Sequence, residues 1–218
     1  MGKIYTALGL MSGTSMDGVD ASIVKSDGND EYSIKLDKYF EYGKEIRHKL
    51  IDIRDKVLMA EDLNEHSEEI KLIEREVTLF HANAVNKIIE TSKIEIDLLG
   101  FHGQTIFHDP KKKITKQLGD GSLLSQLTKK LVVYNFRQND LKNGGQGAPL
   151  ASIYHKLLAK TFEEKKKIKL PIIILNIGGI ANITSIYKNY KITSMDIGPG
   201  NCLIDKWIRV NSDNKFDE

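Results

Sequence analysis

Cysteine is nearly absent from this 218-residue sequence, and Cys202 is its only instance. A disulfide within the chain is therefore excluded, and a reducing compartment is favoured. Long apolar runs are also lacking: none approaches the ~20 residues of a membrane-spanning helix, and the first residues turn polar too soon for a signal peptide. Neither charge sign is in excess, because 32 basic and 30 acidic residues leave a formal net charge of +2. We therefore expect a soluble, cytoplasmic protein without a nucleic-acid or membrane partner.

The sequence contains two copies of one order of elements. In the first copy, apolar alternation predicts three strands joined by tight connections, at 4–10, 19–25 and 31–40. The elements expected next are helices near 46–57, 62–91 and 121–130, a strand at 96–107 that ends in glycines, and a strand at 130–136. The second copy has expected strands at 170–176, 180–187 and 190–196, followed by a helix that begins near "GPGN". A helix near 149–161, with Pro149 at its first position, is expected between the copies.

This repetition indicates an internal duplication of a supersecondary plan. The expected fold class is α/β, with duplicated ribonuclease-H-like lobes of the kind found in actin and the sugar kinases, each a mixed sheet flanked by helices. We expect the first lobe over residues 1–134 and the beginning of an incomplete, truncated second lobe over 135–218. In this architecture a nucleotide can lie between the lobes, with its phosphates against the two glycine-containing hairpin turns.

The stretch "GLMSGTSMDGVD", residues 9–20, places an unusually polar connection between two apolar strands. Backbone N–H groups in a tight glycine turn can bind an anion, and the hydroxyls of Thr14 and Ser15 add donors. Asp17 and Asp20 can hold a Mg²⁺ ion through its water ligands. The turn is no P-loop, because no Gly-Lys-Ser/Thr follows the glycines. The alternative at this point is an ordinary polar hairpin.

Five motifs carry a closer resemblance: "GLMSGTSMDGVD", "GFHGQTIFH", "NGGQGAPL", "LNIGGIANIT" and "DIGPGNCLIDKWI". In this order, across nearly the whole chain, they resemble the anhydro-N-acetylmuramic acid kinases, bacterial enzymes of cell-wall recycling. The resemblance implies an ATP-dependent kinase that opens 1,6-anhydro-N-acetylmuramate with water and phosphorylates O6. The expected product is N-acetylmuramate 6-phosphate, the implied cofactors are ATP and Mg²⁺, and a homodimer is implied for the full-length chain.

The resemblance also implies roles for individual residues. The general base is Asp196, which closes the expected strand before "GPGN". The implied ATP-binding residues are Gly13, Thr14, Ser15, Met16, Asp17, Gly18, Val19 and Asp20, of which Asp17 and Asp20 also bind the metal. The implied substrate-binding residues are Gln104, Thr105, Arg137, Asp140, Gln146 and Asn201. The sequence departs from the family at Asn135, where Asp is usual.

Some alternatives stay open at the level of sequence. Asp196 can be a helix N-cap, a position that favours aspartate. Gln104, Thr105 and Gln146 can simply stabilise glycine-rich turns. His102 and His108 are more typical of structural histidines than of a zinc site, because no Cys or Glu completes a ligand set. Family members are longer than this chain, so the alternative function is a truncated, non-catalytic remnant that binds a sugar or a partner.

Overall fold

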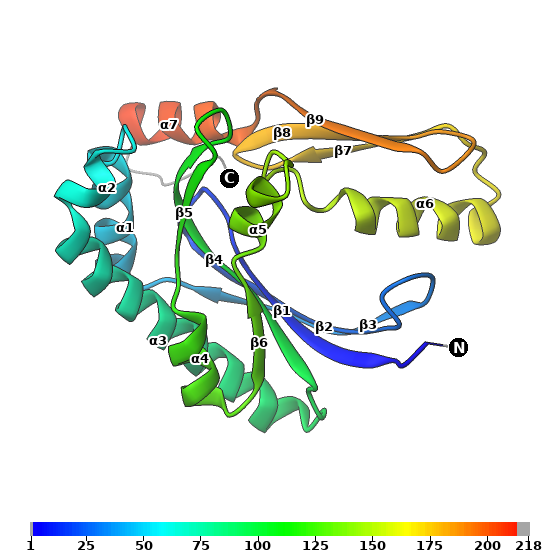
Figure 1. Cartoon of the computed structure of the whole chain (residues 1–218), viewed down its shortest axis with the longest axis horizontal. Helices are drawn as coiled ribbons and strands as arrows, with labels where there is room; N and C mark the ends of the chain where they lie inside the picture. The colour runs from blue at the N-terminus through cyan, green and yellow to red at the C-terminus, as the bar shows by residue number, and fades with distance from the viewer. Residues whose placement is uncertain (1, 213–218) are drawn as a thin grey trace. The chain divides into compact units, whose positions relative to one another are not determined.

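The structure is a computed structural model that describes residues 2–212, apart from the side chain of Lys166. The chain forms two compact units, Met1–Gly147 and Ala148–Glu218, which Figure 1 shows in chain order from blue to red. Each unit has its own sheet, so each is described by itself.

The first unit is built on a mixed sheet with a meander at one edge. The meander consists of β1 (Tyr5–Ser12), β2 (Gly18–Ser26) and β3 (Tyr32–Glu41), and its strands pair antiparallel. Next to β1 lies β4 (Leu98–Asp109) in parallel, and the far edge of β4 pairs with β6 (Leu131–Tyr134) in parallel and with β5 (Ile114–Leu118) antiparallel. The order β3-β2-β1-β4-β6 is that of a ribonuclease-H-like sheet, which confirms the expected fold class.

Helices cover one face of this sheet, as Figure 1 shows for α1, α3 and α4. The helices of the unit are α1 (Lys44–Lys56), α2 (Asp62–Glu65), α3 (Ser67–Ser92), α4 (Gly121–Thr128) and α5 (Phe136–Lys142). Apolar residues of α3 recur every three or four positions, and this stripe packs on Leu8, Leu99 and Phe101 in the core. The stripe runs through His81, which is fully buried, and the neighbouring Phe80 is partly buried and packs against the core.

In the first unit the expected end of one strand was wrong, and two elements were not predicted. The strand β4 does not end at its glycines but continues through them to Asp109, with Gly103 at φ +74°. A β-carbon at position 103 would lie 2.5 Å from the Leu118 carbonyl oxygen, so glycine lets the two strands stay paired there. The basic run near Lys113 leads into strand β5, and the polar stretch after Asn135 forms helix α5; neither element was predicted from the sequence.

The second unit contains the second expected meander. Its strands are β7 (Ile172–Ile177), β8 (Ile180–Ile186) and β9 (Ile192–Pro199), all antiparallel. One face of this sheet packs on α6 (Ser152–Lys166) around a small core of Ala159, Leu170 and Ile186. Residues of opposite parity, such as Ile173 and Leu175, are 67% and 52% exposed. This face of the second sheet therefore carries exposed apolar side chains.

Two boundaries in the second half differ from expectation. Helix α6 begins at Ser152, so Pro149 precedes the helix and is not its first residue. The units divide after Gly147, later than the expected lobe boundary at 134/135. The segment after residue 134 belongs to the first unit because Arg137 donates to Nε2 of His102, at 2.8 Å. Within residues 2–212, no helix combines the length and apolarity needed to cross a bilayer.

Candidate active site

The connection between β1 and β2 is a tight turn whose backbone is held in an unusual shape. The Met16 N–H donates to the Gly13 carbonyl oxygen at 3.3 Å, which closes the turn. Met16 itself lies in the left-handed region at φ 55°, which costs an L-residue about 1–2 kcal/mol. Its side chain is fully buried in the core, and burying a side chain of this size contributes about 1.5–3 kcal/mol. The buried side chain therefore offsets the backbone strain and keeps the turn in place.

The opposite side of the turn carries its polar groups. Thr14 and Ser15 are exposed, and the Ser15 hydroxyl donates to Oδ1 of Asp17 at 2.6 Å. Burial, and then the nearby charge of Asp17, raise the pKa of Asp20. Two carboxylates that repel each other suit a hydrated Mg²⁺ ion, which is commonly held by one or two carboxylates together with phosphates. Among the described residues no group of three or more His, Cys, Asp and Glu could enclose a metal directly. Asp17 and Asp20 are a donor pair of the kind that holds a hydrated Mg²⁺ ion.

Gly18 and Tyr39 fix the side of the turn next to these carboxylates. A β-carbon at Gly18 would lie 2.3 Å from the Phe40 carbonyl oxygen and 2.6 Å from the Tyr39 hydroxyl, so only glycine fits. Partial burial, followed by the charge of Asp17, raises the pKa of Tyr39 to about 12. The phenol therefore keeps its proton at neutral pH and stands as a donor beside the acidic pair. Tyr39 could not be predicted as part of the site, because its sequence pattern is that of an ordinary strand residue.

Beneath the turn lies a buried polar network. The Ser12 hydroxyl is 2.9 Å from the Tyr42 hydroxyl and 3.2 Å from Nε2 of His81. Nδ1 of His81 is 2.8 Å from the Val77 carbonyl oxygen, and Nε2 of Gln104 donates to the Gly13 carbonyl oxygen at 2.9 Å. Ser12, His81 and Gln104 are each at most 1% exposed. Sequence reasoning missed Ser12, Tyr42 and His81; the one available signal was a histidine on the apolar stripe of a helix.

A second polar cluster joins β4 to the segment that follows β6. The Arg137 guanidinium donates through Nε to Nε2 of His102 at 2.8 Å and through Nη1 to the Gly147 carbonyl oxygen at 3.1 Å. Burial, and then the charge of Arg137, lower the pKa of His102 to about 4, so the ring is a neutral acceptor. Oδ2 of Asp140 accepts from the Gly147 N–H at 2.7 Å. Arg137 and Asp140 are thus brought together and shape the loop before Gly147.

Glycine and asparagine residues make this loop possible. A β-carbon at Gly145 would lie 2.1 Å from Oδ2 of Asp140, so glycine leaves room for the carboxylate. Asn135 precedes α5 with φ 61°, a region that Asn and Asp enter more readily than other side chains. The change from the family's Asp to Asn therefore keeps the backbone conformation available. Nδ1 of His102 contacts the Gly103 carbonyl oxygen at 2.7 Å, so both ring nitrogens have protein partners.

The remaining predicted sugar contacts of the first unit differ in exposure. Gln104 and Thr105 lie within β4 and not in a turn. Gln104 is completely buried, so its amide contacts the turn at Gly13 rather than the solvent. Thr105 is partly buried, and its hydroxyl accepts from Nε2 of Gln117 at 3.3 Å. Gln146 is exposed on the loop shaped by Asp140.

In the second unit, Asp196 lies inside β9 and does not cap a helix. Helix α7 (Asn201–Asn211) is preceded by Gly200 at its N-cap position, which rules out the capping alternative for Asp196. Asp196 pairs with Asn182 of β8, which in turn pairs with Asn176 of β7. Side chains at paired positions share one face of a sheet, so Asn176, Asn182 and Asp196 form a polar row on the face that carries Ile186.

The row ends at an irregularity of the strand. The register shifts between Ala181 and Asn182, because Ile197 is an extra residue on β9. Such bulges are common beside active sites, where they redirect side chains. The following helix starts against the β7–β8 turn: the Asn201 N–H donates to the Gly178 carbonyl oxygen at 2.8 Å, and the Asn201 side chain is exposed.

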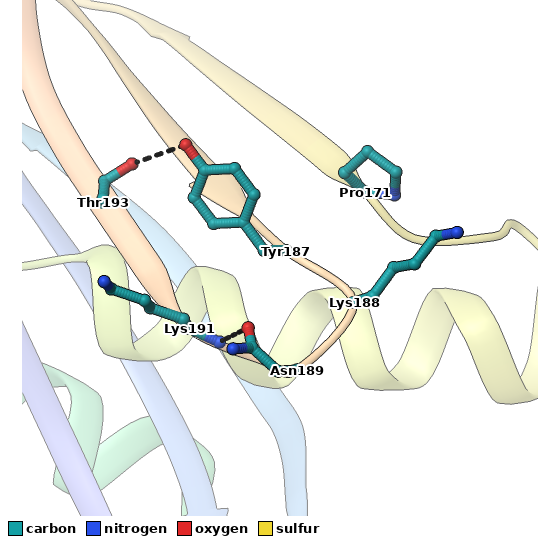
Figure 2. A pocket seen from close by; sticks show the side chains of 6 residues that line it. All are labelled: Pro171, Tyr187, Lys188, Asn189, Lys191 and Thr193. Carbon is teal, nitrogen blue, oxygen red and sulfur yellow. Dashed lines mark hydrogen bonds between the residues drawn. The ribbon is translucent and has the colours of Figure 1, made fainter.

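A separate pocket lies at the other end of this sheet (Figure 2). Its lining residues are Pro171, Tyr187, Lys188, Asn189, Lys191 and Thr193. The hydroxyls of Tyr187 and Thr193 are 3.5 Å apart, and the Lys191 N–H donates to Oδ1 of Asn189 at 3.0 Å. Thr193 and Asp196 are three positions apart on one strand, so their side chains point to opposite faces. The pocket therefore does not include the predicted catalytic carboxylate.

The sheet order of the first unit, its polar hairpin turn and the second meander define an α/β protein of the ribonuclease-H-like, actin-like class. Residues 5–218 match the family model for anhydro-N-acetylmuramic acid kinase, and the chain belongs to this family.

Individual relatives agree with this assignment. The chain is 54% identical over 220 residues to an anhydro-N-acetylmuramic acid kinase of Pelagibacter ubique, and the match covers 100% of this chain and 58% of the relative. It is 40% identical over 220 residues to the enzyme of that name from Rhizobium etli, covering 100% and 59%. The chain thus spans less than two thirds of the curated relatives it matches.

Among solved structures, an Aquifex aeolicus Ppx/GppA family member aligns with a TM-score of 0.41 at 12% identity, over 94% of this chain and 54% of that one. A likeness of this size supports no argument about the present chain.

Proposed function

We propose that the chain carries the phosphate-binding turn and the general base of an ATP-dependent kinase. The reaction is the hydrolytic opening of 1,6-anhydro-N-acetylmuramate with phosphorylation of O6, giving N-acetylmuramate 6-phosphate and ADP. The enzyme would serve peptidoglycan recycling and amino-sugar metabolism in the cytoplasm. The observation that supports this most is the family match over residues 5–218, together with a carboxylate, Asp196, that the structure leaves exposed and without a capping role.

The turn after β1 is proposed to bind the phosphates of ATP. Thr14 and Ser15 offer exposed hydroxyls, and the backbone of Gly13 can approach an anion closely. Met16, Gly18 and Val19 are buried, so any contribution from them comes through the backbone. Asp17 and Asp20 would hold Mg²⁺ through water, and the ion would supply positive charge opposite the transferred phosphoryl group.

Asp196 is proposed to remove a proton from the water that attacks C1 of the sugar. The C1–O6 bond then breaks, and O6 takes the γ-phosphoryl group while ADP leaves. A positioned general base of this kind contributes roughly 10²–10⁴-fold to the rate. The polar row places Asn182 beside Asp196 on the same face, where an amide can orient either the water or the carboxylate.

Sugar-binding residues are proposed in each unit separately. Arg137 is the proposed partner of the lactyl carboxylate, because a guanidinium binds carboxylates in defined geometry. Asp140 lies in α5 and accepts from the Gly147 N–H next to Gln146, while Thr105 on β4 and Asn201 on α7 offer hydroxyl and amide groups. Gln104 is proposed to act indirectly, through Gly13.

The experiment that tests this function is the replacement Asp196→Asn in the full-length gene product that carries residues 1–218. We expect kcat to fall by roughly 10²–10⁴-fold, while the affinities for sugar and nucleotide change by a few-fold at most. The product is followed by phosphorus NMR and the released ADP by a coupled assay. Asp205→Asn, which removes a carboxylate from α7, serves as the matched control and should retain activity. Turnover of the Asp196 variant within about tenfold of the parent contradicts the assigned base, and Asp140 is then the next residue to replace.

The alternative is a non-catalytic remnant that binds a sugar or a partner, and the comparisons do not favour it. It predicts sugar binding without any 6-phosphate product in the parent protein. A homodimer is proposed for the full-length protein by analogy with the family. Light scattering at several protein concentrations tests that proposal independently of catalysis.

A further inference from the structure

The turn Gly13–Asp17 is held from below by side chains of three distant segments. Tyr42 follows β3, His81 lies in α3 and Gln104 lies in β4. Their side chains converge on two consecutive residues, Ser12 and Gly13, where β1 passes into the turn. The Tyr42 N–H also donates to the Asp17 carbonyl oxygen at 2.8 Å, so Tyr42 contacts both ends of the turn.

Each proton in this network can be placed. Nδ1 of His81 faces a carbonyl oxygen, which only accepts, so Nδ1 carries the proton. The ring is buried and neutral, and Nε2 is therefore an acceptor that must receive its hydrogen bond from Ser12. The single proton of the Ser12 hydroxyl is then used, so the Tyr42 hydroxyl must donate to Ser12. The hydrogen bonds of the network are therefore donated in one direction: Tyr42 donates to Ser12, and Ser12 donates to His81.

The orientation of the Gln104 amide, which contacts the turn from β4, is also defined. Nε2 of Gln104 faces the Gly13 carbonyl oxygen, so the amide cannot be turned over without placing two oxygens against each other. That carbonyl also accepts the Met16 N–H that closes the turn. Gln104 is fully buried, and in the described part of the chain no donor reaches its Oε1. Leaving a buried amide oxygen without a hydrogen bond costs free energy, which the contact of Nε2 with Gly13 must offset.

We propose that Ser12, Tyr42, His81 and Gln104 are positioning residues that hold the Gly13–Asp17 turn in the shape that receives phosphate groups. This inference rests on the proposed kinase function for its consequence, but its physical content is local order. An anion-binding turn works only if its N–H groups already point at the ligand, since ordering them during binding would cost affinity. The side chains that contact the nucleotide face outward, and the four positioning residues act from the buried side.

The test compares variants that weaken the network with one that weakens the same helix elsewhere. Ser12→Ala and Gln104→Met remove single contacts to the turn, and His81→Leu removes the acceptor. The control is Thr78→Val: Thr78 is fully buried on α3 one turn before His81, but its hydroxyl contacts Glu74 and Asp120 and not the hairpin. His81→Gln is the conservative variant, because its amide oxygen can accept from Ser12.

Hydrogen exchange of the Met16 and Tyr42 amides is the primary measurement, made on residues 1–218 beside the free energy of unfolding of each variant. We expect Ser12→Ala and Gln104→Met to exchange these two amides about tenfold faster than Thr78→Val at equal global stability. His81→Gln should exchange more slowly than His81→Leu. Equal exchange in Ser12→Ala and Thr78→Val overturns the proposal, and this comparison remains available if His81→Leu fails to fold.

Kinetics of the full-length protein separate this inference from the proposed function. There we expect KM for ATP to rise at least about threefold in Ser12→Ala, with KM for the sugar unchanged. If the parent itself shows no phosphoryl transfer, the proposed function fails, and the exchange data still decide whether the network orders the turn. Faster exchange with an unchanged KM for ATP contradicts the assignment of the turn to phosphate binding.

Discussion

Lowering the pH from 7 to 5 should destabilise the first unit through two buried histidines. Burial lowers the pKa of His81 from its ordinary 6.5 to about 4, and burial together with Arg137 lowers the pKa of His102 to the same value. Both rings are neutral in the folded chain and become protonated in the unfolded chain as the pH falls below 6.5. Stability present above pH 6.5 is therefore lost progressively as the pH falls towards 4.

The size of this loss follows from the two pKa values of each ring. At pH 5 an unfolded histidine is almost fully protonated, whereas a folded one with a pKa near 4 is mostly neutral. The difference corresponds to roughly 2 kcal/mol for each histidine between pH 7 and pH 5, or about 4 kcal/mol together. Most carboxylates keep their charge in this window, so the two rings dominate the change in the first unit; burial also lowers the pKa of His155 in the second unit. A loss of this size is a large fraction of the stability of an ordinary domain.

Urea unfolding of residues 1–218 at half-unit steps between pH 7 and pH 5 measures the effect. His81→Gln, which cannot titrate, should lower the total loss by roughly 2 kcal/mol, and His102→Gln should do the same. His48→Gln, at an exposed position on α1, is the control and should leave the slope unchanged. A free energy of unfolding that stays constant over this range, or a His81→Gln slope equal to that of the parent, would refute the assignment of neutral buried rings.

Three further outcomes are expected. Asp17→Asn in the full-length protein should reduce phosphoryl transfer far more than sugar affinity, because Asn can still accept from Ser15 but carries no charge. Steady-state kinetics and a thermal melt of the same variant test this. If the turn is merely structural, the variant loses stability and keeps its activity. Lys93→Gly should stabilise residues 1–218 by about 0.5–1 kcal/mol, because Lys93 is exposed at the end of α3 with φ 55°, a left-handed conformation that glycine adopts without strain. The control is Lys87→Gly inside the helix, which should destabilise the chain by about 1 kcal/mol in the same urea assay. Residues 1–218 should bind MgATP more weakly than micromolar in calorimetry, because the proposed contacts reach only its phosphates; micromolar binding by a monodisperse monomer would contradict this.

Elements with a clear period were predictable from the sequence. Both meanders alternate apolar and polar residues, and α3 repeats apolar residues at helical spacing, so local patterns were sufficient to locate them. The fold class followed from the order of these elements. The boundaries failed where a longer-range contact decided the outcome. The strand β4 passes through Gly103 because β5 pairs beside it, and no local pattern announces that pairing.

The candidate site also has features that could be predicted from the sequence and features that could not. The polar turn was visible because its hydroxyls and carboxylates are consecutive in the sequence. The direction in which each side chain points could not be predicted; Gln104, expected at the sugar, donates to the Gly13 carbonyl oxygen. From the sequence, Asp196 could be a helix N-cap or a general base. The N-cap is excluded because β9 continues to Pro199 and the cap position falls at Gly200.

The contacts beneath the turn also set an order of events during synthesis of the chain. Ser12 is separated from Tyr42 by 30 positions and from His81 by 69, and Gly13 is separated from Gln104 by 91. The hairpin of β1 and β2 is complete in sequence as soon as residue 26 has been added, yet none of its three supporting side chains then exists. Contacts of such long sequence separation form late, because the intervening chain must first be ordered. A nascent chain should therefore gain a fully ordered turn only after Gln104 has left the ribosome.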